Sequence, residues 1–255
     1  MTLNYRIIGR GPPLIILHGL FGSLDNWVSV AKNLAVNSTV CLVDLRNHGQ
    51  SFHDQHFNYE AMVADLDNLI NELRVADYSI LGHSMGGKVA MFYAAQSPHG
   101  IKKLIIVDIA PKKYPVYHQQ ILDGLSSINT EELSSRRKAD DLLSKFVHDP
   151  KIRQFLLKNL KRSSNGSLEW KINLTAIHNH INAVGDALSA TELIQIPTLF
   201  IRGGSSEYIR EEDYSAIHQQ FPQSTINTIP EVGHWVHAEA PQAFLEIVQT
   251  FLDQD

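Results

Sequence analysis

The sequence predicts an α/β protein, built on a doubly wound, mostly parallel sheet with an inserted, mostly helical segment. Short apolar runs alternate along the chain with longer stretches of helical periodicity, and several of these runs are apolar at almost every position. Strands buried on both faces of a parallel sheet have this continuous apolar character. The alternation stops between Pro111 and about Leu193, which indicates an insertion into the sheet.

Strand and helix patterns follow one another in the order typical of a doubly wound sheet. Each strand candidate is a short β-branched run, and each helix candidate is a longer stretch with a helix-compatible pattern. The expected strands are Leu14–His18, Thr39–Asp44, Tyr78–Gly82, Lys103–Asp108, Pro197–Arg202 and Thr225–Ile229, and the expected helices are Tyr59–Leu73, Ser84–Gln96, Glu211–Gln220 and Ala243–Leu252.

The interrupted stretch has helical patterns and one weak strand pattern. We interpret residues 112–193 as a helical cap, or lid, inserted into a core of residues 1–111 and 194–255. Plain packing of these helices on the flank of the sheet is the alternative. The expected helices are Glu131–Lys145, Ile152–Leu160 and Ala176–Ala190, and the weak strand is Ser167–Asn173.

Composition narrows the classes of partner. The 255 residues carry a formal net charge of −5 without a run of Lys or Arg, which argues against nucleic acid or an anionic membrane surface as the main partner. The single cysteine, Cys41, lies in an apolar run and is expected to be a small buried side chain. The N-terminus lacks the basic and long apolar regions of a signal peptide, so a cytoplasmic location is expected. The thirteen histidines are scattered and predict no metal site.

Ser84 is the first candidate for chemistry, because it lies in Gly82-His83-Ser84-Met85-Gly86-Gly87 between a strand and a helix. A serine at such a sharp turn projects its Oγ from the carboxyl end of the strand, and small flanking residues let the turn close. The helix that follows directs backbone N–H groups toward the same point. We therefore expect Ser84 to be a nucleophile.

A second glycine-rich loop, His18-Gly19-Leu20-Phe21-Gly22-Ser23, follows the first long apolar run. Acyl transfer places negative charge on the former carbonyl oxygen, and backbone N–H groups stabilise it. Met85, the residue after the nucleophile, is expected to supply one N–H group. The loop is expected to supply the other from Leu20, with Phe21 as the alternative, while His18 braces the loop.

The base is expected in Gly233-His234-Trp235-Val236-His237, after the last expected strand. Histidine activates a serine at neutral pH because its pKa lies close to 7. We assign this role to His234, because Gly233 gives it a flexible loop. His237 is the competing candidate.

These segments together resemble the α/β-hydrolase superfamily and, more narrowly, the YbfF-type esterases. The likeness extends over nearly the whole chain, which makes it more specific than any one motif. It is carried by His18–Asn26 (HGLFGSLDN), Asp44–Ser51 (DLRNHGQS), Gly82–Lys88 (GHSMGGK), Val107–Pro111 (VDIAP), Arg202–Tyr208 (RGGSSEY) and Gly233–Ala238 (GHWVHA).

The carboxylate that orients the histidine is the least defined part of the triad. In the superfamily it usually follows the strand at Pro197–Arg202, but serine stands there in this chain. Asp108, at the carboxyl end of an earlier strand, is placed where catalytic groups of open α/β sheets gather. The resemblance also implies an acid in the VDIAP segment, so we expect Asp108. Glu207 and Asp186 remain alternatives.

Other polar residues have less specific interpretations. Asp44 and Arg46 are expected to pair and brace a loop beside the site. Lys88 is expected to be solvated or to bridge loops, although it could bind an anionic substrate. Aromatic residues on loops at the same edge of the sheet are candidates for the substrate pocket, namely Phe21, Trp235 and Tyr208.

The resemblance implies hydrolysis of carboxylic esters, and acyl-CoA thioesters as further substrates, through an acyl-serine intermediate. This chemistry requires neither a metal nor an organic cofactor, and its partner is a small-molecule ester or thioester. The alternatives are another triad enzyme of this fold (a C–C bond hydrolase, lyase or peptidase) and a non-catalytic ligand-binding protein. Oligomeric state cannot be deduced from one sequence.

Overall fold

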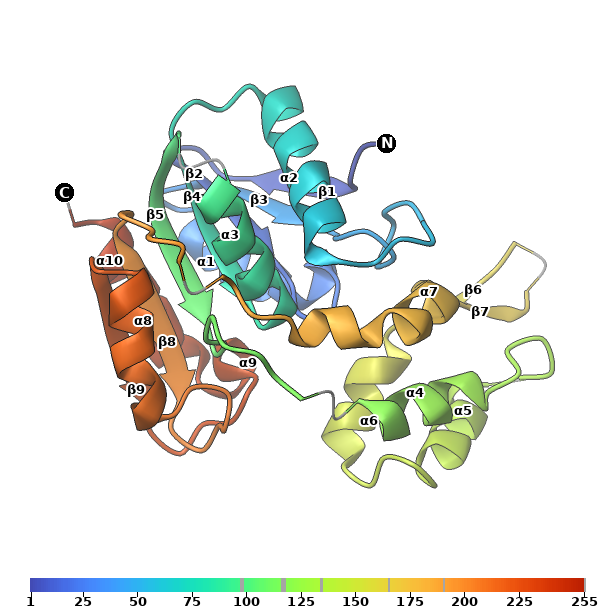
Figure 1. The fold of residues 1–255 in the computed structure, drawn as a ribbon. Coiled ribbons are helices and arrows are strands. Elements are labelled where there is room, and N and C mark those ends of the chain that lie inside the picture. The colour runs from blue at the N-terminus through green and yellow to red at the C-terminus, as the bar shows by residue number, and fades with distance from the viewer. Residues whose placement is uncertain (97–98, 116–117, 134, 165, 190, 255) are drawn as a thin grey trace.

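The computed structural model describes residues 1–96, 99–115, 118–133, 135–164, 166–189 and 191–254. Its centre is a seven-stranded sheet with the order β1-β3-β2-β4-β5-β8-β9 (Figure 1). β1 pairs antiparallel with β3, and every other pair is parallel. The strands are β1 (Tyr5–Ile8), β2 (Pro13–Leu17), β3 (Thr39–Val43), β4 (Tyr78–His83), β5 (Ile101–Val107), β8 (Thr198–Gly203) and β9 (Ser224–Ile229).

The predicted α/β class and mostly parallel sheet are confirmed, and each of the six expected strands is present with ends within two residues of those expected. β1 was not predicted. It is an edge strand whose middle residues, Arg6 and Ile7, are exposed, so it lacks the continuous apolar pattern of the central strands.

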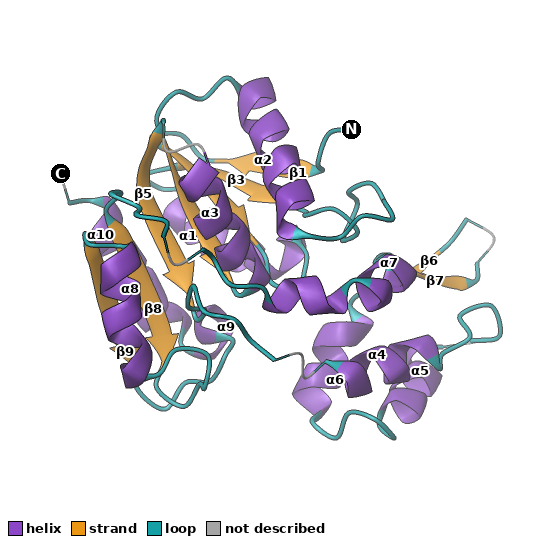
Figure 2. Ribbon diagram, viewed as in Figure 1, coloured by secondary structure: helices purple, strands orange, loops and turns teal. Residues whose placement is uncertain are grey.

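Helices cover both faces of the sheet (Figure 2). Because successive side chains of a strand point to opposite faces, Leu14 and Ile16 of β2 pack in one apolar cluster, whereas Ile15 and Leu17 pack in the other. The first cluster includes residues of α1 (Val28–Leu34) and α10 (Pro241–Leu252). The second includes residues of α2 (Tyr59–Leu73), α3 (Met85–Gln96) and α8 (Tyr214–Gln220).

The segment 112–193, which we call the cap segment, lies between β5 and β8 in sequence and beside one end of the sheet in space (Figure 1). Its short strands β6 and β7 form a separate antiparallel pair. Its elements are α4 (Gln119–Ser126), α5 (Arg136–Leu143), α6 (Pro150–Leu157), β6 (Leu160–Arg162), β7 (Leu168–Trp170), α7 (Leu174–Asn179) and the 3-10 helix η2 (Ile181–Gly185).

Element bounds in the cap segment differ from those expected. α5 begins only at Arg136, because the Ser135 side chain caps it by accepting from the N–H of Lys138. Leu160, expected at the end of a helix, begins β6 instead. The helix expected from Ala176 to Ala190 is divided into α7 and η2. Residues 134 and 190, which belonged to expected helices, lie outside the described residues.

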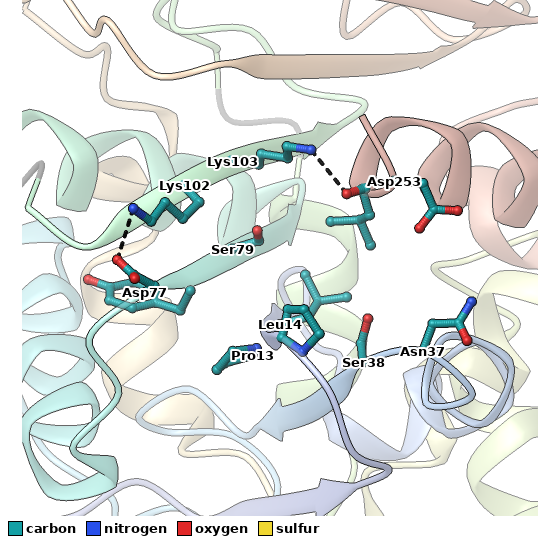
Figure 3. A pocket seen from close by; sticks show the side chains of 12 residues that line it. Pro13, Leu14, Asn37, Ser38, Asp77, Ser79, Lys102, Lys103 and Asp253 are labelled. Atoms are coloured by element: carbon teal, nitrogen blue, oxygen red, sulfur yellow. Dashed lines mark hydrogen bonds and ion pairs between the residues drawn. The ribbon is translucent and has the colours of Figure 1, made fainter. Parts of the chain in front are cut away.

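A small cavity of about 240 Å³ lies at the amino-terminal edge of the strands (Figure 3). Lys103 of β5 donates there to the carbonyl groups of Phe251 and Leu252 at the end of α10, both at 3.0 Å. Lys102 forms an ion pair with Asp77 at 3.0 Å. None of the predicted catalytic residues lines this cavity. Across the described residues, the structure has no helix that is both long and apolar enough to span a membrane.

Candidate active site

The loops after β2 and β4 meet at the centre of the sheet, because these two strands are direct neighbours. β3 continues the sheet on one side of them and β5 on the other, so successive connections run in opposite directions from this point. Ligands of open α/β sheets bind at such a switch point, beyond the carboxyl ends of the strands.

Ser84 occupies a sharp turn between β4 and α3, with a left-handed backbone φ of 52°. Such a φ is unfavourable for a residue with a Cβ, and its presence at this turn marks a constrained position. The turn needs glycine on both sides. A Cβ at Gly82 would lie 2.3 Å from the carbonyl oxygen of Gly86, and one at Gly86 would lie 2.4 Å from that of Leu17. The sequence therefore dictates the close approach of α3 to β2.

Asp108 directly follows β5 and is completely buried. Its Oδ1 accepts from the N–H of Gly203 at 3.0 Å. Its Oδ2 accepts from Nδ1 of His234 at 2.8 Å and from the hydroxyl of Ser206. The structure thus joins two residues that are 126 positions apart in sequence.

The alternative carboxylates lie elsewhere. Glu207 is exposed and forms an ion pair with Arg210 at 2.5 Å. Asp186 is exposed, and its backbone carbonyl accepts from Lys88 at 2.8 Å. Serine stands at the usual position of the acid, and Ser206 in that loop donates to Asp108, a contact that no sequence pattern predicted.

The His234 loop is held by its ring and by its backbone. The ring stacks on Tyr208, with centroids 3.9 Å apart and an angle of 18° between the planes. The carbonyl of His234 accepts from Nε2 of His83 at 2.9 Å. Glu239 accepts from the N–H groups on either side of His234, those of Gly233 at 2.9 Å and Trp235 at 3.2 Å. With Nδ1 engaged by Asp108, Nε2 is the ring's remaining acceptor.

His237 has a different environment from His234. It is buried, and its ring stacks on Trp27 with centroids 4.0 Å apart. Burial lowers the pKa of His237 to about 3, so the ring is neutral. Burial likewise lowers the pKa of His83, which packs against both His234 and His237.

The loop after β2 has its peptide groups fixed one by one. The carbonyl of Gly19 accepts from Nδ1 of His18 at 2.8 Å and from the N–H of Gly22 at 3.0 Å. The N–H of Phe21 donates to Nε2 of His48 at 3.2 Å. The N–H of Leu20 donates to no acceptor in the described part of the chain. Met85, the first residue of α3, also has its N–H outside the hydrogen-bond ladder of the helix.

His18 and His48 are neutral, because burial lowers their pKa values to about 4 and about 3. Each ring has one donor and one acceptor, and both are used. His18 accepts from the N–H of Leu45 at 3.0 Å while it donates to Gly19. His48 accepts from Phe21 and donates to the carbonyl of Arg46 at 2.9 Å. His18 therefore braces the loop, as expected.

Candidate residues from the loops after β2 and β4 line a cavity of about 980 Å³. Ser84 and His234 line it together with the three aromatic residues predicted for the pocket, Phe21, Tyr208 and Trp235. The cap segment supplies His118, four apolar residues and three charged ones, and none of these was predicted to line the pocket. The apolar residues are Ile121, Ile152, Phe155 and Leu156, and the charged ones are Asp149, Lys151 and Lys158.

The expected pair between Asp44 and Arg46 is wrong. Arg46 forms a bidentate ion pair with Asp65, at 2.5 and 2.9 Å. Asp44 instead accepts from the N–H groups of Leu24 at 2.8 Å and Gln50 at 2.9 Å. It therefore braces two loops through their backbone, which needs no cationic partner.

Lys88 bridges loops, which was one of the two expected roles. Its ammonium donates to the carbonyl groups of Lys112 at 2.5 Å and Asp186 at 2.8 Å, one near each end of the cap segment. It is fully buried and does not line the large cavity. Among the described residues, no group of three or more His, Cys, Asp or Glu side chains is placed to hold a metal ion.

Comparison with known proteins identifies the relatives of this chain. The model of the α/β-hydrolase fold family matches residues 12–241. A Danio rerio protein named sn-1-specific diacylglycerol lipase ABHD11 is 38% identical over 263 residues, covering 99% of this chain and 83% of the relative. The Escherichia coli (strain K12) protein named esterase YbfF is 34% identical over 244 residues, covering 94% of this chain and 93% of the relative.

A solved structure described as a marine microorganism esterase superposes with a TM-score of 0.96. Its sequence is 40% identical, and the match covers 98% of this chain and 99% of that one. The fold is also shared with E-2-(acetamidomethylene)succinate hydrolase, at a TM-score of 0.79 and 20% identity.

Proposed function

Because the chain belongs to the α/β-hydrolase fold family and is similar to the YbfF-type esterases, we propose that it is a serine esterase acting through an acyl-serine intermediate. One observation carries the proposal: a strained serine turn opens into the same cavity as a histidine whose Nδ1 is held by a buried carboxylate. The names of the relatives, esterase and diacylglycerol lipase, support ester hydrolysis as the reaction.

In the first half-reaction, Ser84 Oγ attacks the ester carbonyl while Nε2 of His234 accepts its proton. Asp108 keeps the other ring nitrogen protonated and stabilises the imidazolium that forms. The N–H groups of Leu20 and Met85 stabilise the oxyanion, and each contributes about 3 kcal/mol to the stabilisation of the transition state. His234 then protonates the departing alcohol, which leaves the acyl group on Ser84.

In the second half-reaction, His234 removes a proton from water, and the resulting hydroxide attacks the acyl-serine. The carboxylic acid leaves and Ser84 regains its proton. The same steps apply to a thioester, in which a thiol departs instead of an alcohol. We therefore include acyl thioesters, such as acyl-CoAs, among the proposed substrates.

The volume of the cavity and its apolar lining residues favour an ester with an extended acyl chain. About 980 Å³ is at the upper end of the range for small-molecule sites. The cap segment places Ile121, Ile152 and Phe155 along one wall, where an alkyl chain would lose its contact with water. In this proposal the cap segment acts as a lid that supplies the acyl-binding surface.

Hydrolysis of p-nitrophenyl esters and acyl-CoAs of several chain lengths tests the proposal, with the Ser84→Ala variant as comparison. The variant should lose turnover and labelling by a fluorophosphonate probe, and its circular dichroism should be unchanged. Ser205→Ala, an exposed serine on the loop after β8, is the matched control and should keep both activities. Turnover that survives in Ser84→Ala would overturn the mechanism.

A further inference from the structure

We infer that Asn159, a residue of the cap segment, is a positioning residue for the oxyanion hole. This inference rests on the proposed function and deepens it. It makes the cap segment part of the apparatus that stabilises the transition state, in addition to the wall it gives the cavity.

Asn159 is buried and lies between α6 and β6, with 3% of its surface exposed. Its Nδ2 donates to the carbonyl of Phe21 at 2.8 Å and to that of Leu156 at 3.1 Å. Its own backbone is also held, because its carbonyl accepts from the N–H of Lys171 at 2.7 Å. The amide is therefore a rigid support reaching from the cap segment to the loop after β2.

The supported residue is the strained one of that loop. Phe21 has a φ of 59°, which costs about 1 kcal/mol or more for a residue with a Cβ and persists only where neighbours enforce it. Its N–H is held by His48 of the core, and its carbonyl is held by Asn159 of the cap segment. The two restraints act on opposite sides of the same residue.

The path from Asn159 to the oxyanion donor is two peptide groups long. The peptide group that joins Phe21 to Gly22 accepts from Asn159 through its oxygen and donates to the carbonyl of Gly19 through its N–H. That carbonyl belongs to the peptide group whose N–H is Leu20's. In a trans peptide the C=O and N–H point in opposite directions, so fixing the Gly19 carbonyl fixes the Leu20 donor.

The source of these restraints makes Asn159 distinctive. His18, His48 and Gly22 hold the loop from within the core. Within the described residues, Asn159 is the cap side chain that hydrogen-bonds to this loop. The seating of the cap segment and the alignment of the Leu20 N–H are therefore coupled through one amide.

Removal of the amide should affect the transition state more than the bound substrate. Asn159→Leu, which is close in size but has no donor, should lower kcat about tenfold and change KM less than twofold. A trifluoromethyl ketone, which forms a tetrahedral oxyanion on the nucleophilic serine, should bind more weakly by the same factor as kcat/KM falls, because it tracks transition-state binding. Titration with the fluorophosphonate normalises each rate to the folded, active enzyme.

Asn173→Leu is the matched control, because Asn173 is a second asparagine that ties the cap segment to the core. Its Nδ2 donates to Oδ1 of Asn47 at 3.2 Å and to the carbonyl of Asp54 at 3.3 Å, and neither acceptor belongs to the loop after β2. The Asn173→Leu variant should loosen the cap segment but leave the ratio of ketone affinity to KM unchanged. Asn159→Asp keeps the size of the side chain, so it replaces Asn159→Leu if that variant does not fold, with the same expected loss.

Two results would overturn the inference. One is ketone affinity and kcat within twofold of the parent in a folded Asn159 variant. The other is an equal loss in Asn173→Leu, which would indicate general loosening of the cap segment. Either result leaves the esterase proposal intact, because that proposal fails only if Ser84→Ala still turns over substrate.

Discussion

The strand-end loops of the core and the cap segment are held in place in different ways. Around the core site, single groups take several hydrogen bonds: Asp108 accepts from Gly203, Ser206 and His234. The cap segment is joined to the core by side chains of one part that donate to backbone carbonyls of the other, namely Lys88, Asn159 and Tyr59, whose hydroxyl donates to the carbonyl of Val184 at 2.7 Å. The proposed catalytic groups are therefore held by hydrogen bonds within the core, and Asn159 links the cap segment to the loop that carries the Leu20 N–H.

The largest effect that tests this difference is expected in the core. Asp108→Asn replaces the carboxylate that accepts from Nδ1–H of His234 with a neutral amide, so neither the ring tautomer with the proton on Nδ1 nor the imidazolium is stabilised any longer. We expect kcat to fall about 10³–10⁴-fold with little change in KM. Steady-state kinetics with a p-nitrophenyl ester measures it. Glu207→Gln, on the exposed alternative acid, should remain within twofold of the parent; a large loss there instead would shift the acid to Glu207.

Ser206→Ala is expected to have a smaller effect in the same region. It removes one of three donors to Asp108 and leaves the Gly203 N–H and His234 in place. Loss of one hydrogen bond to a buried carboxylate costs about 1–2 kcal/mol. If this loss weakens the support of His234 in the transition state, kcat should fall about tenfold. Ser205→Ala is the neighbouring control. An effect as large as that of Asp108→Asn would show that Gly203 and His234 cannot hold Asp108 in place without Ser206.

The same two regions differ in how well the sequence predicts them. Local apolar runs predict strand ends at His18 and Asp108, one residue beyond the observed ends at Leu17 and Val107, and the glycines around Ser84 specify its turn. The role of Ser206 could not be predicted, because it requires β5 and β8 to be neighbours, with Val107 paired to Ile201. Adjacency of strands that are separated by an insertion is a tertiary property.

In the cap segment, even the helix bounds depend on details that periodicity does not report. α6 begins after Asp149, whose side chain accepts from the N–H of Lys151 at 2.7 Å, and it ends before β6. The unpredicted α4 is only eight residues long. Asn159 falls inside the helix expected over Ile152–Leu160, and no sequence signal marks its contact with Phe21.

Glu239→Gln sharpens the comparison at a smaller scale, because it alters the support of the His234 loop without touching its ring. The Gly233 N–H donates to Oε2 and the Trp235 N–H to Oε1, so the amide keeps one of these two bonds, without its charge, and places an NH2 group at the other. We expect kcat to fall about threefold. Glu231→Gln, another acidic residue on the cavity wall, serves as control. Equal effects in the two variants would indicate a charge effect on substrate binding instead of loop support.

The smallest effect on activity is expected at Lys88, where the readout is stability. Burial lowers the pKa of Lys88 from 10.5 to about 7, because the charged ammonium is removed from water between the two ends of the cap segment. Between these two values the unfolded chain binds a proton that the folded protein does not. The free energy of unfolding should therefore rise with pH in this window, by about 1 kcal/mol per unit. Below pH 7 both states are protonated and this contribution no longer changes.

Urea unfolding at pH 7, 8 and 9 should show the rise in the parent and its loss in Lys88→Met, whereas Lys102→Met, at an exposed ion pair, should retain it. If the free energy of unfolding still rises with pH in Lys88→Met, the Lys88 ammonium is not the group whose titration causes the rise.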